Sequence, residues 1–191
     1  MRGWLVAITD FGDSAVLLPL AAAMLLWLLL LRAPRAAAWW VAAVGFCIGL
    51  TAVLKIFFFR CPPIHNLHSP SGHTSLSILI YGALALVIMV DGGNLRRVVM
   101  IGGGAGLIFA IAASRLLLDM HSMPEIALGL MIGVVGLTVF GYGYLRCRPE
   151  VVRLSPLLVS AVVLISTLHG SQLRAEEVLH RITGYLHIHC G

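Results

Sequence analysis

Charged residues are scarce in this chain. Of its 191 residues, 11% are Asp, Glu, Lys or Arg, while 60% are hydrophobic. Soluble domains carry roughly a quarter charged residues, so this composition excludes an ordinary soluble domain and predicts an integral membrane protein. The sequence also lacks a basic stripe with interleaved aromatic residues, so no nucleic-acid partner is expected. The net charge of +5 instead fits contacts between basic loops and membrane lipids.

Six apolar runs approach the length of about 20 residues that crosses a bilayer. Open strand edges cannot be satisfied in lipid, so the runs are predicted to be helices of one all-α, polytopic bundle, a single domain over residues 1–191. Residues 1–13 are expected to form a short interfacial helix anchored by Trp4 and Phe11, and residues 171–191 a polar tail. The predicted spans are residues 14–31, 36–59, 73–90, 98–114, 124–145 and 154–170.

Glycines spaced four apart predict close helix packing, at Gly102 with Gly106 and at Gly129 with Gly133. A phosphate-binding glycine loop is the alternative for Gly102 to Gly104, but no strand precedes them. Packing is therefore the favoured interpretation of both pairs.

Arginines concentrate in the loops on one side of the six-span arrangement. By the positive-inside rule that side is cytoplasmic, and the opposite side, with both termini, faces the periplasm of a bacterial inner membrane. Cys61 and Cys190 share the periplasmic side, where a disulfide is allowed, whereas Cys47 should be an apolar filler and Cys147 a reduced thiol. No paired C-x-x-C spacing occurs, so a zinc or redox motif is not expected. The arginines are Arg32, Arg35, Arg96, Arg97, Arg146, Arg148 and Arg153.

The first polar motif is the run from Pro70 to His73, P-S-G-H. Ser69 is predicted to cap a helix whose first turn begins with Pro70. The backbone amides of Ser71 and Gly72 would then donate to an anion such as phosphate, with His73 in reach of it. The alternative is a capped helix start with an interfacial histidine.

The second polar motif, S-R-x5-H-x3-E, runs from Ser114 to Glu125. His121 and Glu125 are four apart, so on a helix they would share a face. A carboxylate that accepts from one imidazole nitrogen leaves the other as a directed nucleophile or base. Arg115 offers a planar fork to phosphate oxygens. The alternative is a surface ion pair between Arg115 and Asp119 beside a capped helix.

Two basic residues precede these motifs. Lys55, the only lysine, and Arg60 interrupt an apolar run. Each could reach a bound anion or simply extend to the membrane surface.

Together these residues resemble the type 2 phosphatidic acid phosphatase (PAP2) family, which shares its helical core with vanadium haloperoxidases. The family's motifs are K-x6-R-P, P-S-G-H and S-R-x5-H-x3-D. The second is complete here, and the third differs only in that Glu125 replaces aspartate. The first is compressed, since four residues separate Lys55 from Arg60 and Cys61 precedes the proline. The resemblance covers about residues 50 to 145.

The resemblance implies a membrane lipid phosphatase that needs no metal or other cofactor. His121 would form a phosphohistidine, Glu125 would orient it, and His73 would protonate the leaving oxygen. The substrate would be a lipid phosphate: phosphatidate, phosphatidylglycerol phosphate, a polyprenyl diphosphate or a lipid A phosphate. The phosphate would be held by Lys55, Ser71, Gly72 and Arg115, with Arg60 as a further candidate.

Three alternatives remain open from the sequence. A lipid phosphotransferase would use the same phosphohistidine, with a lipid hydroxyl replacing water. A non-catalytic lipid-binding or transport protein could retain the fold. A metal hydrolase could use His121 and Glu125 with His65, His68 and His73.

Overall fold

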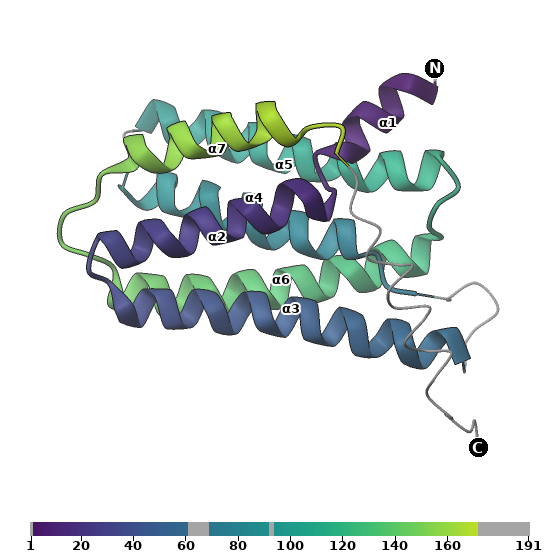
Figure 1. Ribbon diagram of the computed structural model, residues 1–191, viewed down its shortest axis with the longest axis horizontal. Coiled ribbons are helices and arrows are strands. Elements are labelled where there is room, and N and C mark those ends of the chain that lie inside the picture. The colour runs from purple at the N-terminus through teal and green to yellow at the C-terminus, as the bar shows by residue number, and fades with distance from the viewer. Residues whose placement is uncertain (1, 61–68, 92–93, 172–191) are drawn as a thin grey trace.

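The structure, a computed structural model, describes residues 2–60, 69–91 and 94–171, and these form seven α-helices without a strand. The all-α prediction is confirmed, and each predicted span corresponds to one of the helices α2 to α7. These six helices run alternately up and down in one bundle (Figure 1), and the first and last described residues lie at the same end. The helices are α1 (Arg2–Asp10), α2 (Ser14–Leu30), α3 (Pro34–Arg60), α4 (Gly72–Asp91), α5 (Asn94–Leu117), α6 (Met123–Cys147) and α7 (Leu154–Leu168).

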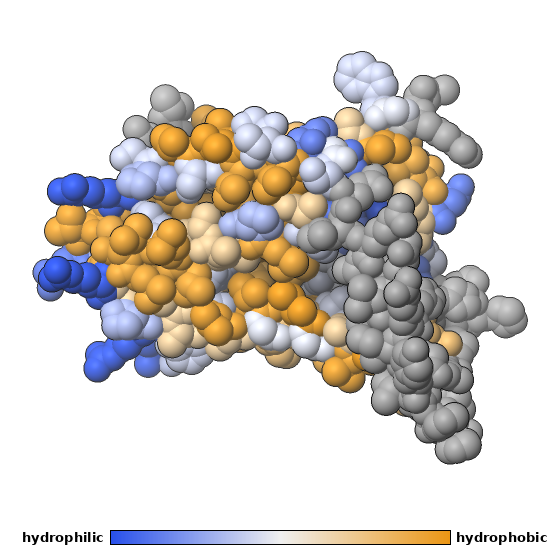
Figure 2. All heavy atoms as spheres, viewed as in Figure 1, coloured by the Kyte–Doolittle hydropathy of each residue, from blue (hydrophilic) through white to orange (hydrophobic). Residues whose placement is uncertain are grey.

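Among the described residues, four helical stretches are long and apolar enough to cross a membrane, which makes this a membrane protein. They are Gly3–Leu30, which joins α1 and α2, then Pro34–Phe59, Gly72–Asp91 and Met123–Cys147. The apolar parts of α5 and α7 are shorter, so a count of six spans stays a prediction. Large apolar side chains cover the flank of the bundle (Figure 2), as expected of a surface that faces lipid.

The short helix predicted within residues 1–13 is present as α1. Trp4 is exposed, as an interfacial anchor would be, but Phe11 is half-buried and packs against the ring of His169, with centroids 4.5 Å apart. His169, which follows α7, also places its Nε2 2.9 Å from the carbonyl oxygen of Ala7. These contacts fasten α1 to the end of the bundle where α7 ends.

One of the two glycine pairs packs as predicted. A Cβ on Gly129 would lie 2.6 Å from the carbonyl oxygen of Ser71, and Gly133 is equally tight against α4. Among the described residues, no heavy atom lies within 4 Å of a Cβ built on Gly102 or Gly106, and both glycines are exposed. The predicted packing of Gly102 with Gly106 within the chain is therefore wrong, because this face of α5 points outward.

The cysteines within the described residues behave as expected. Cys47 is fully buried, with its Sγ 3.5 Å from the carbonyl oxygen of Ile132, which confirms its role as a filler between α3 and α6. Cys147 is a partly exposed thiol. The predicted Cys61–Cys190 disulfide and the polar tail beyond Ser171 lie outside the described residues.

Candidate active site

The residues of both motifs meet at one end of the bundle, where α3 and α5 end and α4 and α6 begin (Figure 1). Burial separates these side chains from ordinary interfacial residues. Charged groups are rarely buried without compensating partners. The exposed fractions are 4% for Lys55, 0% for Ser71, 7% for Arg115, 8% for His121 and 5% for Glu125.

The carboxylate of Glu125 joins the two motif loops. Its Oε2 lies 3.0 Å from Nδ1 of His121 and accepts a hydrogen bond of 2.9 Å from the backbone amide of Ser122. Its Oε1 accepts a hydrogen bond of 2.8 Å from the backbone amide of Ser69, in the loop before α4. Glu125 is the third residue of α6, the position from which a glutamate can reach back to the residue before the helix.

The predicted contact between His121 and Glu125 is present, but the helical reason given for it is wrong. His121 lies in the turn before α6, which begins at Met123, so the two residues do not share a helix face. The backbone amides of Met120 and His121 donate to the carbonyl oxygen of Arg115, at 3.1 and 3.3 Å. This turn brings the imidazole back over the first turn of α6. When Nδ1 donates to Glu125, the lone pair of His121 is on Nε2.

The surroundings of His121 favour a neutral imidazole. Burial lowers the pKa of His121 below its ordinary value, and the positive charges of Arg115 and Lys55 lower it further. The hydrogen bond and charge of Glu125 act in the opposite direction without reversing the shift. The same electrostatic effects indicate that Arg115 and Lys55 belong to the surroundings of His121.

The first turn of α4 is capped two residues later than predicted. The helix begins at Gly72, and Ser71 precedes it as the capping residue, whereas Ser69 and Pro70 stay outside the helix. The hydroxyl of Ser71 accepts from the backbone amide and the hydroxyl of Thr74, at 3.4 and 3.0 Å.

This shift changes which amides lie at the helix start. The backbone amide of Ser71, predicted to donate to an anion, instead donates to the carbonyl oxygen of Glu125 at 3.1 Å. The amides of Gly72 and His73 occupy the first two helical positions, which have no acceptor within the helix. The candidate anion contact of this turn therefore moves one residue along the chain.

Lys55 and Arg115 do not reach out to the membrane surface. Lys55 is almost fully buried, which excludes the alternative of a snorkelling lysine. Arg115 places Nη1 2.9 Å from the Sδ of Met120. Asp119, its partner in the alternative of a surface ion pair, is exposed, whereas Arg115 itself is buried. The prediction for Arg60 falls on a side chain outside the described part of the structure.

Asp13 is a neighbour of this site that sequence reasoning missed. Its Oδ2 lies 3.6 Å from the Nε2 of His73, although the two residues are far apart in the chain. A sequence signal exists, because Asp13 stands directly before the apolar run that begins at Ser14, in the position of a helix cap. That signal explains a cap, but it does not predict contact with a histidine.

No metal centre is evident among the described residues, where no three His, Cys, Asp or Glu side chains are grouped to hold an ion. His65 and His68, which the metal-hydrolase alternative requires, lie outside the described residues.

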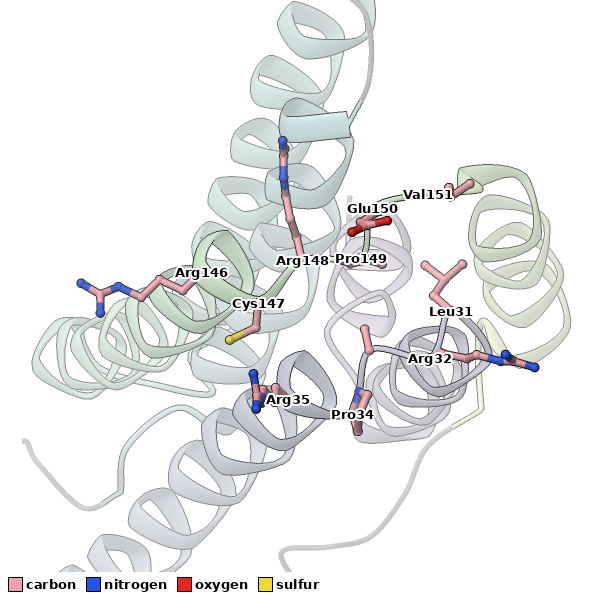
Figure 3. Close-up of a pocket in the computed structure, with 11 residues that line it drawn as sticks. Leu31, Arg32, Pro34, Arg35, Arg146, Cys147, Arg148, Pro149, Glu150 and Val151 are labelled. Atoms are coloured by element: carbon pink, nitrogen blue, oxygen red, sulfur yellow. The ribbon is translucent and has the colours of Figure 1, made fainter.

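The opposite end of the bundle carries a pocket of about 730 Å³ between the α2–α3 and α6–α7 connections (Figure 3). Arg32, Arg35, Arg146 and Arg148 contribute to its lining. In the close-up Arg32 and Arg146 extend away from the pocket, and Arg35 and Cys147 both line it. This arginine end holds none of the predicted site residues.

Fold and site together define a helical membrane protein with a buried histidine–carboxylate pair at one end of its bundle. The chain is 31% identical over 184 residues to an uncharacterized 22.5 kDa protein in the cps region of Klebsiella pneumoniae, an alignment that covers 92% of this chain and 88% of that protein. The chain belongs to the same family as that Klebsiella protein. No protein-family model matches the chain, and no solved structure matches it.

Proposed function

We propose that this protein is a PAP2-like membrane lipid phosphatase that works through a phosphohistidine. The observation that carries the proposal is the buried pair of His121 and Glu125, joined to the start of α4 through one carboxylate. A neutral imidazole held at Nδ1 by a carboxylate is a directed nucleophile at Nε2. Arg115 and Lys55, buried near it, supply the positive charge that a phosphate needs.

The proposed reaction has two steps. In the first, Nε2 of His121 attacks phosphorus, the P–N bond forms, and the bond from phosphorus to the lipid oxygen breaks. The leaving oxygen takes a proton from His73. In the second, water gives a proton to His73 and attacks the phosphohistidine, which releases inorganic phosphate and restores neutral His121. Positioning and neutralisation of charge on the phosphoryl oxygens supply most of the catalysis in such transfers.

A lipid substrate fits the place of this site. The candidate residues lie at the end of a membrane bundle, where a phosphate head group meets water while its tail stays in lipid. We propose phosphatidate, phosphatidylglycerol phosphate, a polyprenyl diphosphate or a lipid A phosphate as the substrate.

The charge of the two ends supports an orientation. The arginine end carries Arg32, Arg35, Arg146 and Arg148, and the positive-inside rule assigns such an end to the cytoplasm. We therefore place the proposed site on the periplasmic side of a bacterial inner membrane, in keeping with the bacterial relative. Thiol labelling of single cysteines in intact cells, one introduced beside Arg35 and one beside Trp4, tests this side assignment.

The test is release of inorganic phosphate by the purified protein from a panel of these lipid phosphates in detergent micelles. We expect His121→Ala to lose activity by at least about a thousandfold while its helical content and elution volume stay unchanged. Full activity in His121→Ala would exclude the mechanism. No release by the wild type from any lipid would favour a binding or transport protein.

Two further measurements separate the remaining alternatives. A phosphotransferase would transfer the phosphoryl group to an added lipid hydroxyl in preference to water. A metal hydrolase would lose its activity after exhaustive chelation and regain it with an added divalent cation.

A further inference from the structure

The turn between α1 and α2 is fixed against α4 and α5. Tyr81 of α4 donates its hydroxyl to the carbonyl oxygen of Phe11 at 2.7 Å. Gly12 comes so close to α5 that an added Cβ would lie 2.7 Å from Cγ2 of Ile111. The next residue, Asp13, is therefore held in place by contacts that have no part in phosphate chemistry.

Asp13 uses its two carboxylate oxygens differently. Oδ1 accepts a hydrogen bond of 2.8 Å from the backbone amide of Ala15 and so caps α2. Oδ2 lies 3.6 Å from Nε2 of His73. The side chains of His73 and Asp13 are 20% and 10% exposed. A pair shielded to this degree is screened less by salt than a surface pair.

Buried charges at this end of the bundle bear on the protonation of His73. Lys55 from α3 and Arg115 from α5 bring two buried cations to this end of the bundle. Their charge disfavours a protonated imidazole. Glu125 is taken up by His121 and by two backbone amides. Of the other acids at this end, Asp10 ends α1 and Asp119 is exposed after α5.

We propose that Asp13 is the positioning residue of His73: its carboxylate orients the ring through Nε2 and stabilises the imidazolium that protonates the leaving oxygen. This inference rests on the proposed function. Two histidine–carboxylate pairs then divide the work. Glu125 keeps His121 ready as a nucleophile, and Asp13 keeps His73 ready as an acid that donates from Nδ1. The N-terminal helix pair thereby becomes part of the catalytic apparatus.

Asp13→Asn is the informative variant. An amide oxygen can still accept from Ala15 and cap α2, but the negative charge beside His73 is lost. The activity is measured on a lipid phosphate, whose alkoxide must be protonated on leaving, and on p-nitrophenyl phosphate, whose leaving group needs no proton.

For Asp13→Asn we expect kcat/KM on the lipid phosphate, which reports the first step, to fall about 10- to 100-fold, part of the contribution of a general acid. On p-nitrophenyl phosphate the fall in kcat/KM should be less than about threefold, because the first step needs no acid there. The basic limb of the pH profile for the lipid phosphate should move to lower pH, since the imidazolium loses its partner. Asp13→Glu should recover part of the lost rate. Glu150→Gln, an exposed acid at the arginine end, should change neither activity.

Equal losses on both substrates, or no loss on the lipid phosphate, would overturn the role of Asp13. A lower thermal unfolding temperature together with equal losses would assign Asp13 to capping alone. If the wild type released no phosphate from either substrate, the proposed function itself would fail, and the inference with it.

Discussion

The two ends of the bundle treat charge in opposite ways. At the motif end Lys55, Arg115 and Glu125 are almost completely withdrawn from solvent. At the arginine end Arg32 and Arg146 are exposed around an open pocket. Removing a charge from water costs several kcal/mol unless partners compensate for it. Burying two cations and a carboxylate at the motif end therefore costs stability and holds these groups in a fixed arrangement. The exposed arginines of the other end stay hydrated, and they interact only with the membrane potential and lipid head groups.

At the arginine end α4 and α6 are also held together by polar side chains, but different residues make the contacts. Tyr144 of α6 donates its hydroxyl to Oδ2 of Asp91 at 2.6 Å, and Nη1 of Arg148 lies 3.7 Å from Oδ1 of the same carboxylate. Asp91 thus holds α4 to α6, as Glu125 holds their other ends together. Of these two sets of contacts, the one at Glu125 includes a histidine, His121, whose Nε2 lone pair can attack a substrate.

Replacing Glu125 should have the largest effect on the difference between the two ends of the bundle. The carboxylate accepts from two backbone amides and faces Nδ1 of His121, whereas glutamine offers one accepting oxygen and turns an NH₂ group toward a donor. For Glu125→Gln we expect kcat to fall by about 10²–10⁴, since loss of the carboxylate releases the tautomer of the histidine. Thermal unfolding should also show a loss of about 1–3 kcal/mol from unsatisfied buried groups.

The comparison variants sharpen that result. Arg35→Gln, at the other end, should retain phosphate release within about twofold, as expected of a surface change away from the site. Glu125→Asp introduces the aspartate of the PAP2 motif but shortens the reach to the amide of Ser69, and a displacement of about 1 Å costs on the order of a hundredfold in rate. If Glu125→Gln kept full activity, His121 would not depend on this carboxylate and the mechanism would have to be abandoned.

Gly129→Ala should separate packing at the motif end from packing elsewhere. A Cβ there would meet the carbonyl oxygen of Ser71 at 2.6 Å, so α6 must move away from the start of α4. Overpacking of this kind costs about 1–3 kcal/mol, which thermal unfolding in detergent measures, and phosphate release should fall with it.

Gly106→Ala is the matched control. Nothing lies within 4 Å of its Cβ, and replacing an exposed helical glycine by alanine adds up to about 1 kcal/mol. Equal effects of the two substitutions would contradict the packing described for α6.

The helices could be predicted from the sequence because apolar runs in lipid leave the backbone no other way to satisfy its hydrogen bonds. The ends of the helices were harder to predict. The cap of α4 fell on Ser71 instead of Ser69, because both serines can cap and the choice depends on the amides that Glu125 already holds. Gly102 and Gly106 have the same spacing as Gly129 and Gly133, and spacing does not say which face of a helix meets a neighbour.

The site shows the same limit. The contact between His121 and Glu125 was predicted from a helical spacing that the chain does not use there, since the histidine lies in the turn before α6. Asp13 could be recognised only as a helix cap, because its contact with His73 depends on how the α1–α2 turn packs on α4. Motif spacing identifies residues that work together, but tertiary packing decides which atoms meet.

The pH dependence of the first step gives the smallest effect, and it tests burial directly. His121 must be neutral to attack phosphorus, and burial with the nearby charge of Arg115 lowers its pKa below the ordinary value of 6.5. Activity should therefore persist as the pH falls through 6.5 and decline only on the acid side of it, where His121 becomes protonated.

Two variants should move this acid limb in opposite directions. Arg115→Gln removes a cause of the lowered pKa of His121, so its acid limb should move to higher pH. Glu125→Gln removes a cause that raises the pKa, so its acid limb should move to lower pH. Both profiles are measured as kcat/KM on p-nitrophenyl phosphate, which reports the ionisation of the free enzyme. The ionisation of the substrate is common to all variants and cancels from the differences. Shifts of the same sign in the two variants would show that another group determines the acid limb. A wild-type acid limb centred at pH 6.5 or above would mean that His121 titrates as it would in water, like an exposed residue of the arginine end.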